Sequence, residues 1–260
     1  MTQLRTQPTR DPEADKLVFI EMCKISLWGN NNTEPSLPTT SEDTQTSRSN
    51  AEERILVNDI PAAYAHFLSK RNFPWQPNNE FRVDIVLGQA GFELYTDLIL
   101  AGYLLSAGLA TTVVLHPKSI PWFVLDALPS DLDALLAALA APRQFYETPT
   151  EEEKGKGGME PEKLTDEEVG DLEFVFEEWS RFRADGKLVL RPDTDRVWTG
   201  PGCFWRLCAE AGPVVEDLSG GHLAIFKGDL NYRKLVGDVS TYLPESFLRF
   251  PCSPLLSRLR

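Results

Sequence analysis

The sequence predicts an α/β protein with a doubly wound, mostly parallel sheet and flanking helices. Two short apolar runs rich in β-branched residues, 83–87 and 111–115, have the length and composition of buried strands. A helical pattern at 92–106 separates them, and two strands joined by a long helix imply a parallel unit with a right-handed crossover. Helix and strand patterns continue to alternate after this unit, which extends the same architecture.

The region before the sheet is predicted as accessory structure. Residues 1–16 are polar and charged and are predicted as a flexible tail. A short amphipathic helix at 17–28 stops at a glycine followed by three asparagines, and a linker rich in Ser, Thr, Asn and Pro completes the region 17–56. The α/β domain then occupies 57–260 and opens with a helix that has Pro61 in its first turn.

The remaining elements follow from the spacing of apolar residues and turn residues. The predicted order is strand 83–87, a glycine-containing turn at 88–91, helix 92–106, strand 111–115, helix 132–139, helix 171–182, strand 187–190, a helical turn at 203–211 and strand 223–226. This alternation is typical of a doubly wound sheet, in which ligands gather at the carboxyl ends of the strands.

The net charge of −13 is concentrated in one stretch of the chain. Thirteen acidic residues lie between positions 147 and 178, against three lysines. The part at 147–170 is predicted as a solvated acidic linker inserted into the domain. The rest of the chain has no basic surface pattern, so nucleic acid is excluded as a predicted partner.

The sequence predicts a cytoplasmic protein with no membrane partner. Its first residues lack the apolar core of a signal peptide, and no run of about 18 apolar residues occurs. The four cysteines, Cys23, Cys203, Cys208 and Cys252, form no C-x-x-C pair. They are predicted to be free thiols in a reducing compartment rather than zinc ligands or redox pairs.

Polar residues cluster directly after three of the predicted strands. They are Gly88, Gln89, Gly91 and Glu93 after the first; His116, Lys118 and Ser119 after the second; and Lys227, Asp229, Asn231 and Arg233 after the last. Each cluster alone has a structural explanation in turn glycines, solvated lysines or a capping aspartate. Because parallel strands end at one edge of a sheet, the coincidence of three clusters favours a functional site, in which Asp229 could bind a divalent cation.

Several segments strongly resemble the damage-control phosphatases, a family of metal-dependent sugar-phosphate phosphatases once described as acidic-residue (protein-glutamate) methyltransferases. The matching segments are Leu27-Trp28-Gly29-Asn30, Val83-Asp84-Ile85-Val86-Leu87, Ala90-Gly91-Phe92-Glu93-Leu94, the run from Val114 to Phe123, and Lys227-Gly228-Asp229-Leu230-Asn231-Tyr232-Arg233-Lys234. They run in family order between about residues 17 and 238, and the chain resembles a shortened, divergent member.

The resemblance implies an α/β fold and hydrolysis of a small phosphorylated metabolite, such as fructose 1-phosphate or fructose 6-phosphate. It also implies a Mn²⁺ or Ni²⁺ ion, with Co²⁺ or Mg²⁺ as alternatives. By the resemblance, Asp229 and Gln89 are metal ligands, and Asp229 and Glu93 are catalytic. Lys118, Asn231 and Arg233 would bind the substrate.

The sequence departs from the family pattern at the metal site. The family has an Asp-Asn pair after the first strand, and this chain has Gly88 and Gln89. Glycine offers no oxygen, and the amide of glutamine lies one methylene further out, so metal binding is predicted to be weakened or lost. Asp84, Glu93 and Asp97 could compensate, although none is expected to occupy the vacated corner.

Two departures in length accompany this change. Family members carry a helical region before the Trp-Gly-Asn segment and an Arg-Thr-x-Lys motif after the Gly-Asp motif, and this sequence has neither. Three functions stay open: a metal-dependent phosphatase, a catalytically inactive relative that binds a ligand or partner, and a repurposed enzyme that works without the metal. The departures favour lost or changed activity.

Overall fold

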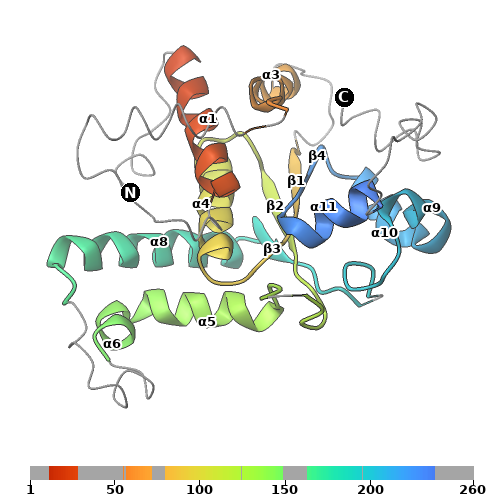
Figure 1. Ribbon diagram of the computed structural model, residues 1–260. Helices are drawn as coiled ribbons and strands as arrows, with labels where there is room; N and C mark the ends of the chain where they lie inside the picture. Colours follow the sequence, from red (N-terminus) through yellow and green to blue (C-terminus); the bar gives the residue numbers. More distant parts are fainter. Residues whose placement is uncertain are drawn as a thin grey trace.

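Parallel strands form the sheet of this protein, as predicted. A computed structural model describes residues 12–28, 55, 57–71, 80–123, 125–148, 163–194 and 196–237. Within these residues the strands are β1 (Arg82–Val86), β2 (Thr112–His116), β3 (Leu188–Leu190) and β4 (Leu223–Phe226). Their order in the sheet is β3-β2-β1-β4, and every neighbouring pair is parallel (Figure 1).

Helices cover both faces of this sheet, which confirms the doubly wound α/β prediction. One face carries α1 (Pro12–Trp28), α3 (Ile60–Arg71), α4 (Phe92–Ser106), α5 (Pro129–Ala140) and α8 (Asp166–Ala184), with the short α6 (Pro142–Tyr146) beside α5 and α8. The other face carries η2 (Phe204–Arg206), α9 (Leu207–Glu210), α10 (Gly212–Ser219) and α11 (Gly228–Val236). Figure 1 shows the strands between these two groups.

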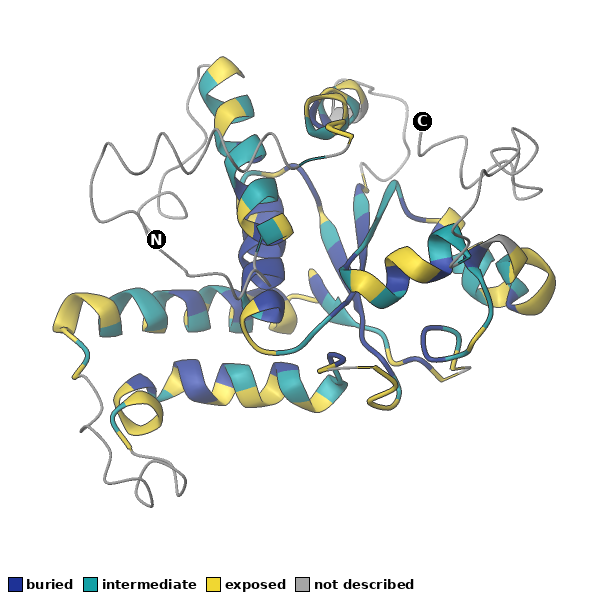
Figure 2. Ribbon diagram, in the orientation of Figure 1, coloured by how far each residue is buried: buried dark blue, intermediate teal, exposed yellow. Residues whose placement is uncertain are grey.

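The two faces of β1 contribute to separate apolar clusters. Val83 and Ile85 belong to the larger core with α4, and Val86 packs with Trp198 and Phe204 on the opposite face. Successive side chains of a strand point to opposite faces, so a strand covered on both sides is largely apolar. The exception in β1 is the buried Asp84, which pairs with Arg82 and His116. Figure 2 shows that β1 and most of α4 are buried.

Several predicted boundaries need correction. α1 begins at Pro12, so residues 12–16 are helical and not part of a tail. α8 begins at Asp166, because Thr165 caps it and forms a capping box with Glu168; the last five residues of the predicted acidic linker are therefore its first turn. The predicted tail before residue 12, the linker at 29–54 and most of the acidic insertion lie outside the described residues.

α11 was not among the elements predicted from the sequence. The buried side chains of this helix include Asn231 and Lys234, so its inward face does not have the apolar periodicity of a core helix. The helix ends at Gly237, whose left-handed conformation (φ 71°) forms its C-cap.

The cysteine prediction holds for Cys23 and Cys203, which are free thiols. It is wrong for Cys208, which is disulfide-bonded. Across the described residues, no helix combines the length and the apolar character that a membrane span requires.

Replacing Leu98 of α4 by alanine should destabilise the protein strongly. Leu98 is fully buried in the larger core, so Leu98→Ala leaves a cavity and should lower the free energy of unfolding by about 2–5 kcal/mol. Leu17→Ala is the matched control, because Leu17 is exposed on α1, and its effect should stay within about 0.5 kcal/mol. Urea unfolding followed by circular dichroism measures both; equal effects would contradict the assigned core.

Candidate functional site

The site is built at the point where the chain reverses its direction across the sheet. The chain moves from β1 to β2 and β3, and then returns to place β4 on the other side of β1. Ligands of open α/β sheets bind at such a switch point, outside the carboxyl ends of the two strands. Gly88 follows β1 there, and Gly228 follows β4.

These two glycines bring the two backbones into contact. A Cβ atom on Gly88 would lie 3.0 Å from the Cα of Gly228, and a Cβ on Gly228 would lie 2.9 Å from the Cα of Gly88. Gly228 also has a φ of 82°, which favours glycine. The close approach leaves no room for a side chain that starts at residue 88 unless its surroundings shift.

Glu93 fills the corner beside Gly88. A Cβ on Gly88 would overlap the Oε1 atom of Glu93, which lies in the first turn of α4 and is 4% exposed. The backbone N–H of Gln89 donates to this carboxylate, while its buried Oε2 atom has no hydrogen-bond partner. Burial raises the pKa of Glu93, and the ammonium of Lys227 opposes the shift. The Oε1 atom of Glu93 therefore lies where a side chain at residue 88 would begin.

A second buried carboxylate, Asp126, lies beside Gln89 and was missed in the sequence analysis. The two residues form an isolated antiparallel bridge, supported by a hydrogen bond of 3.1 Å from the N–H of Ala127 to the carbonyl of Gly88. Asp126 is 5% exposed and accepts a hydrogen bond of 2.5 Å from the N–H of Phe123. This backbone pairing brings the aspartate to the site, and no sequence motif predicted it.

Lys118 and Asn231 join the ends of the strands to α11. The buried Lys118 Nζ donates to the carbonyl of Leu87 (2.8 Å) and to Oδ1 of Asn231 (3.2 Å). The amide nitrogen of Asn231 donates to the carbonyls of Val86, Leu87 and Lys227. Both ends of the Asn231 amide are thus engaged within the protein. Burial lowers the pKa of Lys118 to about 8, although the carboxylate of Asp126 opposes the shift.

Lys227 connects the same edge to α1. Its Nζ atom lies 3.1 Å from Oδ1 of Asp97 on α4 and donates to the carbonyl (2.5 Å) and hydroxyl (3.1 Å) of Ser26. Ser26 also donates to Asp97 at 2.7 Å. This contact spans three elements that are far apart in the chain, so the ammonium of Lys227 holds α1 and α4 against the end of β4.

Asp229 and Arg233 lie outside this buried group. Their side chains, about half exposed, form an ion pair of 2.9 Å across one turn of α11. The Arg233 guanidinium also lies over the ring of Phe123, 5.8 Å from its centroid. Asp229 follows Gly228 directly, so the pair stands beside the end of β4, at the switch point.

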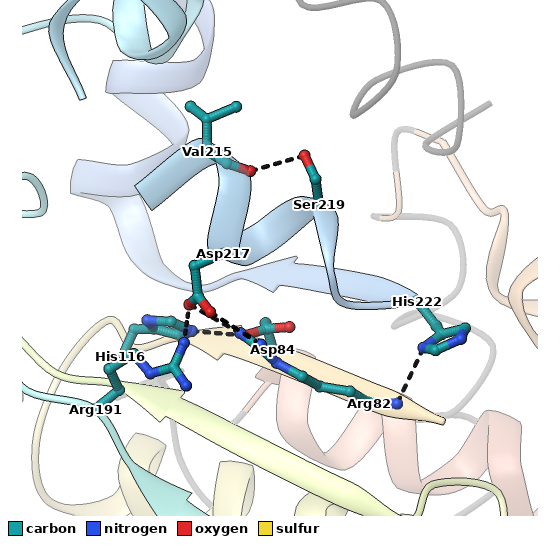
Figure 3. A network of polar contacts seen from close by, with 8 residues as sticks. All are labelled: Arg82, Asp84, His116, Arg191, Val215, Asp217, Ser219 and His222. Atoms are coloured by element: carbon teal, nitrogen blue, oxygen red, sulfur yellow. Dashed lines mark hydrogen bonds and ion pairs between the residues drawn. The ribbon is translucent and has the colours of Figure 1, made fainter. Parts of the chain in front are cut away.

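A different cluster, Asp84, His116 and Asp217, could hold a metal ion on the other face of the sheet (Figure 3). One ligand atom of each lies within 4.8 Å of the others, and within the described ranges no other set of three or more Asp, Glu, His or Cys side chains meets this criterion. His116 Nε2 lies 2.8 Å from Oδ1 of Asp84.

Two arginines already neutralise this second cluster. Arg82 contacts Asp84 at 2.5 Å and Asp217 at 3.0 Å, and Arg191 also pairs with Asp217, as Figure 3 shows. A cavity of about 180 Å³ opens next to it, lined in part by His116 and Asp217. A cation would have to compete with two guanidinium groups, so the arrangement fits an ion-pair network that joins β1, β2 and α10 better than a primary metal site.

The fold defines an α/β protein with buried acids and lysines gathered at the switch point of its sheet, and comparison with known proteins identifies its family. Residues 1–249 match the model of the damage-control phosphatase ARMT1-like domain, so the chain belongs to this family. This confirms the resemblance that the sequence motifs indicated.

Individual relatives are all described as damage-control phosphatase ARMT1. The Danio rerio protein is 30% identical over 226 residues, which cover 85% of this chain and 44% of the relative. The human protein is 32% identical over 240 residues (90% and 48%), and the Xenopus laevis protein is 33% identical over 207 residues (78% and 41%). The chain spans about half the length of the curated relatives it matches.

The burial of Lys118 should make stability depend on alkaline pH. The pKa of Lys118 in the folded protein, about 8, lies below its ordinary value of 10.5, so the unfolded chain binds more protons between these values. Stability therefore gains as pH rises through this window, by on the order of 1 kcal/mol per pH unit.

The test is the difference in unfolding free energy between the wild type and Lys118→Met, measured in urea at pH 7.5 and pH 9.5. The unfolding free energy of the wild type, relative to that of Lys118→Met, should be larger at pH 9.5 than at pH 7.5. Lys187→Met, at a half-exposed lysine, is the control. A pH-independent difference for Lys118→Met would show that this ammonium is well solvated.

Proposed function

We propose that this chain hydrolyses small phosphate monoesters with the help of a divalent cation bound at the switch-point crevice. The observation that carries the proposal is the buried carboxylate oxygen Glu93 Oε2, which has no partner at the sheet edge where ligands of this fold class bind. Membership of the damage-control phosphatase ARMT1-like family supports the same class of reaction.

The residues around the crevice fit a hard divalent cation. Carboxylate and amide oxygens are the ligands that Mg²⁺ and Mn²⁺ accept, and Gln89 and Asp126 offer such oxygens from neighbouring backbone segments. A bound cation would polarise the phosphoryl group. Mn²⁺, Ni²⁺, Co²⁺ and Mg²⁺ all stay open, and Asp229 remains a proposed ligand only if its side chain turns away from Arg233.

The groups proposed to bind phosphate come from α11 and from the segment after β2. α11 begins immediately after Lys227, with no side-chain cap, so its first backbone N–H groups favour an anion. Two of the three Lys118 ammonium hydrogens have acceptors within the protein, which leaves one for a phosphate oxygen. Arg233 on α11 adds a further positive charge, while Asn231 would position Lys118 rather than touch the substrate.

The proton transfer is proposed to involve the acids at the site. Asp229 is partly exposed and close to the crevice, so it could exchange protons with solvent as the leaving group departs. Glu93 supplies a buried carboxyl group around which the reacting groups would be arranged. Fructose 1-phosphate and fructose 6-phosphate are the proposed substrates within this class, and a cytoplasmic location remains part of the proposal.

The test is phosphate release from p-nitrophenyl phosphate and fructose 1-phosphate by the purified chain with Mn²⁺ or Ni²⁺. We expect release that stops with EDTA and falls at least 100-fold in Asp126→Asn, because the buried carboxylate beside Gln89 is lost. Asp133→Asn makes the same chemical change at an exposed aspartate and should keep full activity. Release that is insensitive to EDTA would contradict the metal requirement.

A catalytically inactive relative that only binds a ligand is the second proposal. The ion pair of Asp229 with Arg233 favours it, because the conspicuous acid of the last motif is neutralised at the surface. An absence of phosphate release with all four cations, combined with binding of fructose 1-phosphate in calorimetry, would favour this function over hydrolysis.

A further inference from the structure

The space in which a side chain at residue 88 would begin is occupied by another acid. A Cβ on Gly88 would overlap Oε1 of Glu93 and lie 3.0 Å from both the Gly228 Cα and the carbonyl carbon of Lys227. Glu93 comes from α4, whereas residue 88 belongs to the loop after β1. A negative charge is therefore present at this corner although residue 88 cannot supply one.

The bonding of Glu93 is incomplete. One backbone N–H, that of Gln89, donates to its carboxylate, and Oε2 is buried without a donor. The nearby ammonium groups direct their described hydrogen bonds elsewhere: Lys227 to Ser26, and Lys118 to Leu87 and Asn231. Buried carboxylate oxygens in proteins are normally paired or bound to a metal, so this atom indicates a missing positively charged partner.

The balance of charged groups around Glu93 also indicates a missing positive charge. The buried acids Glu93, Asp97 and Asp126 face two buried ammonium groups, Lys118 and Lys227, which leaves one negative charge in excess. A divalent cation would convert this excess into one positive charge, which suits a phosphate group next to the N-terminus of α11.

We infer that Glu93 is a direct ligand of the divalent cation and takes the place of a carboxylate at residue 88, with Gln89 and Asp126 as its neighbours. The inference rests on the proposed function. It adds that Glu93 supplies the negatively charged ligand that residue 88 lacks. Glu93 lies in the first turn of α4, where the helix dipole also favours a carboxylate.

The experiment titrates Mn²⁺ alone into four purified full-length proteins, with binding followed by calorimetry and by the electron paramagnetic resonance signal of free Mn²⁺. They are the wild type, Glu93→Gln, the double variant Gly88→Asp with Glu93→Gln, and the double variant Gly88→Asn with Glu93→Gln. The last two differ only in whether residue 88 carries a charge. Circular dichroism establishes that each protein is folded.

We expect Glu93→Gln to weaken Mn²⁺ binding at least tenfold, because it keeps the shape of the side chain and removes its charge. The double variant with Gly88→Asp should recover binding, and the double variant with Gly88→Asn should not. If the Gly88→Asp protein does not fold, because residue 88 is crowded, Glu93→Asp replaces it and should bind more tightly than Glu93→Gln.

Unchanged Mn²⁺ binding in Glu93→Gln would overturn the inference, as would equal recovery in the two double variants. Phosphate release measured on the same samples separates this failure from that of the proposed function. A wild type that binds Mn²⁺ and releases phosphate, with Glu93→Gln binding as tightly, refutes only the role of Glu93. A wild type that neither binds Mn²⁺ nor releases phosphate refutes both.

Discussion

The contact between the backbones of Gly88 and Gly228 is the constraint on which the rest of the site depends. It closes the end of β1 against the end of β4, so the loops that follow the two strands share one crevice. A side chain at residue 88 would meet Glu93 and both backbones unless they shift, and this corner is filled instead by an acid from another element, Glu93 on α4. The amide of Asn231 fixes the same approach, since it bonds to carbonyls on both sides of the gap.

The sheet and the helices that cover it were predictable from the sequence because their burial leaves a periodic apolar pattern. Val83 and Ile85 lie in a strand covered on both faces, and a short run of β-branched residues is typical of such a strand. α11 lacked this signal because it buries Asn231 and Lys234, whose hydrogen bonds are to backbone carbonyls. The start of α8 depended on local capping by Thr165 and Glu168 rather than on apolar spacing.

The sequence predicted where in the fold the candidate site lies, but not which side chains contact one another there. Parallel strands bring polar residues to one edge, so Lys118 and Asn231 were correctly expected to lie together, and they are hydrogen-bonded. Glu93 lies beside the contact between Gly88 and Gly228, which are 140 positions apart in the chain. Asp126 is brought to the site by a single backbone bridge to Gln89. Asp229 was prominent in the motif, but its carboxylate is directed to Arg233.

The hydrogen bonds of Lys227 attach α1 to the segment between β4 and α11, so α1 is part of the structure that holds the site. The ammonium is buried between Ser26 and Asp97, so a shift of α1 would remove its two Ser26 acceptors and leave the Asp97 carboxylate as its described partner. The lysine could regain the lost hydrogen bonds only by moving, and the turn before α11 would move with it. A binding event or a sequence change on α1 would therefore alter the shape of the crevice without touching any residue that lines it.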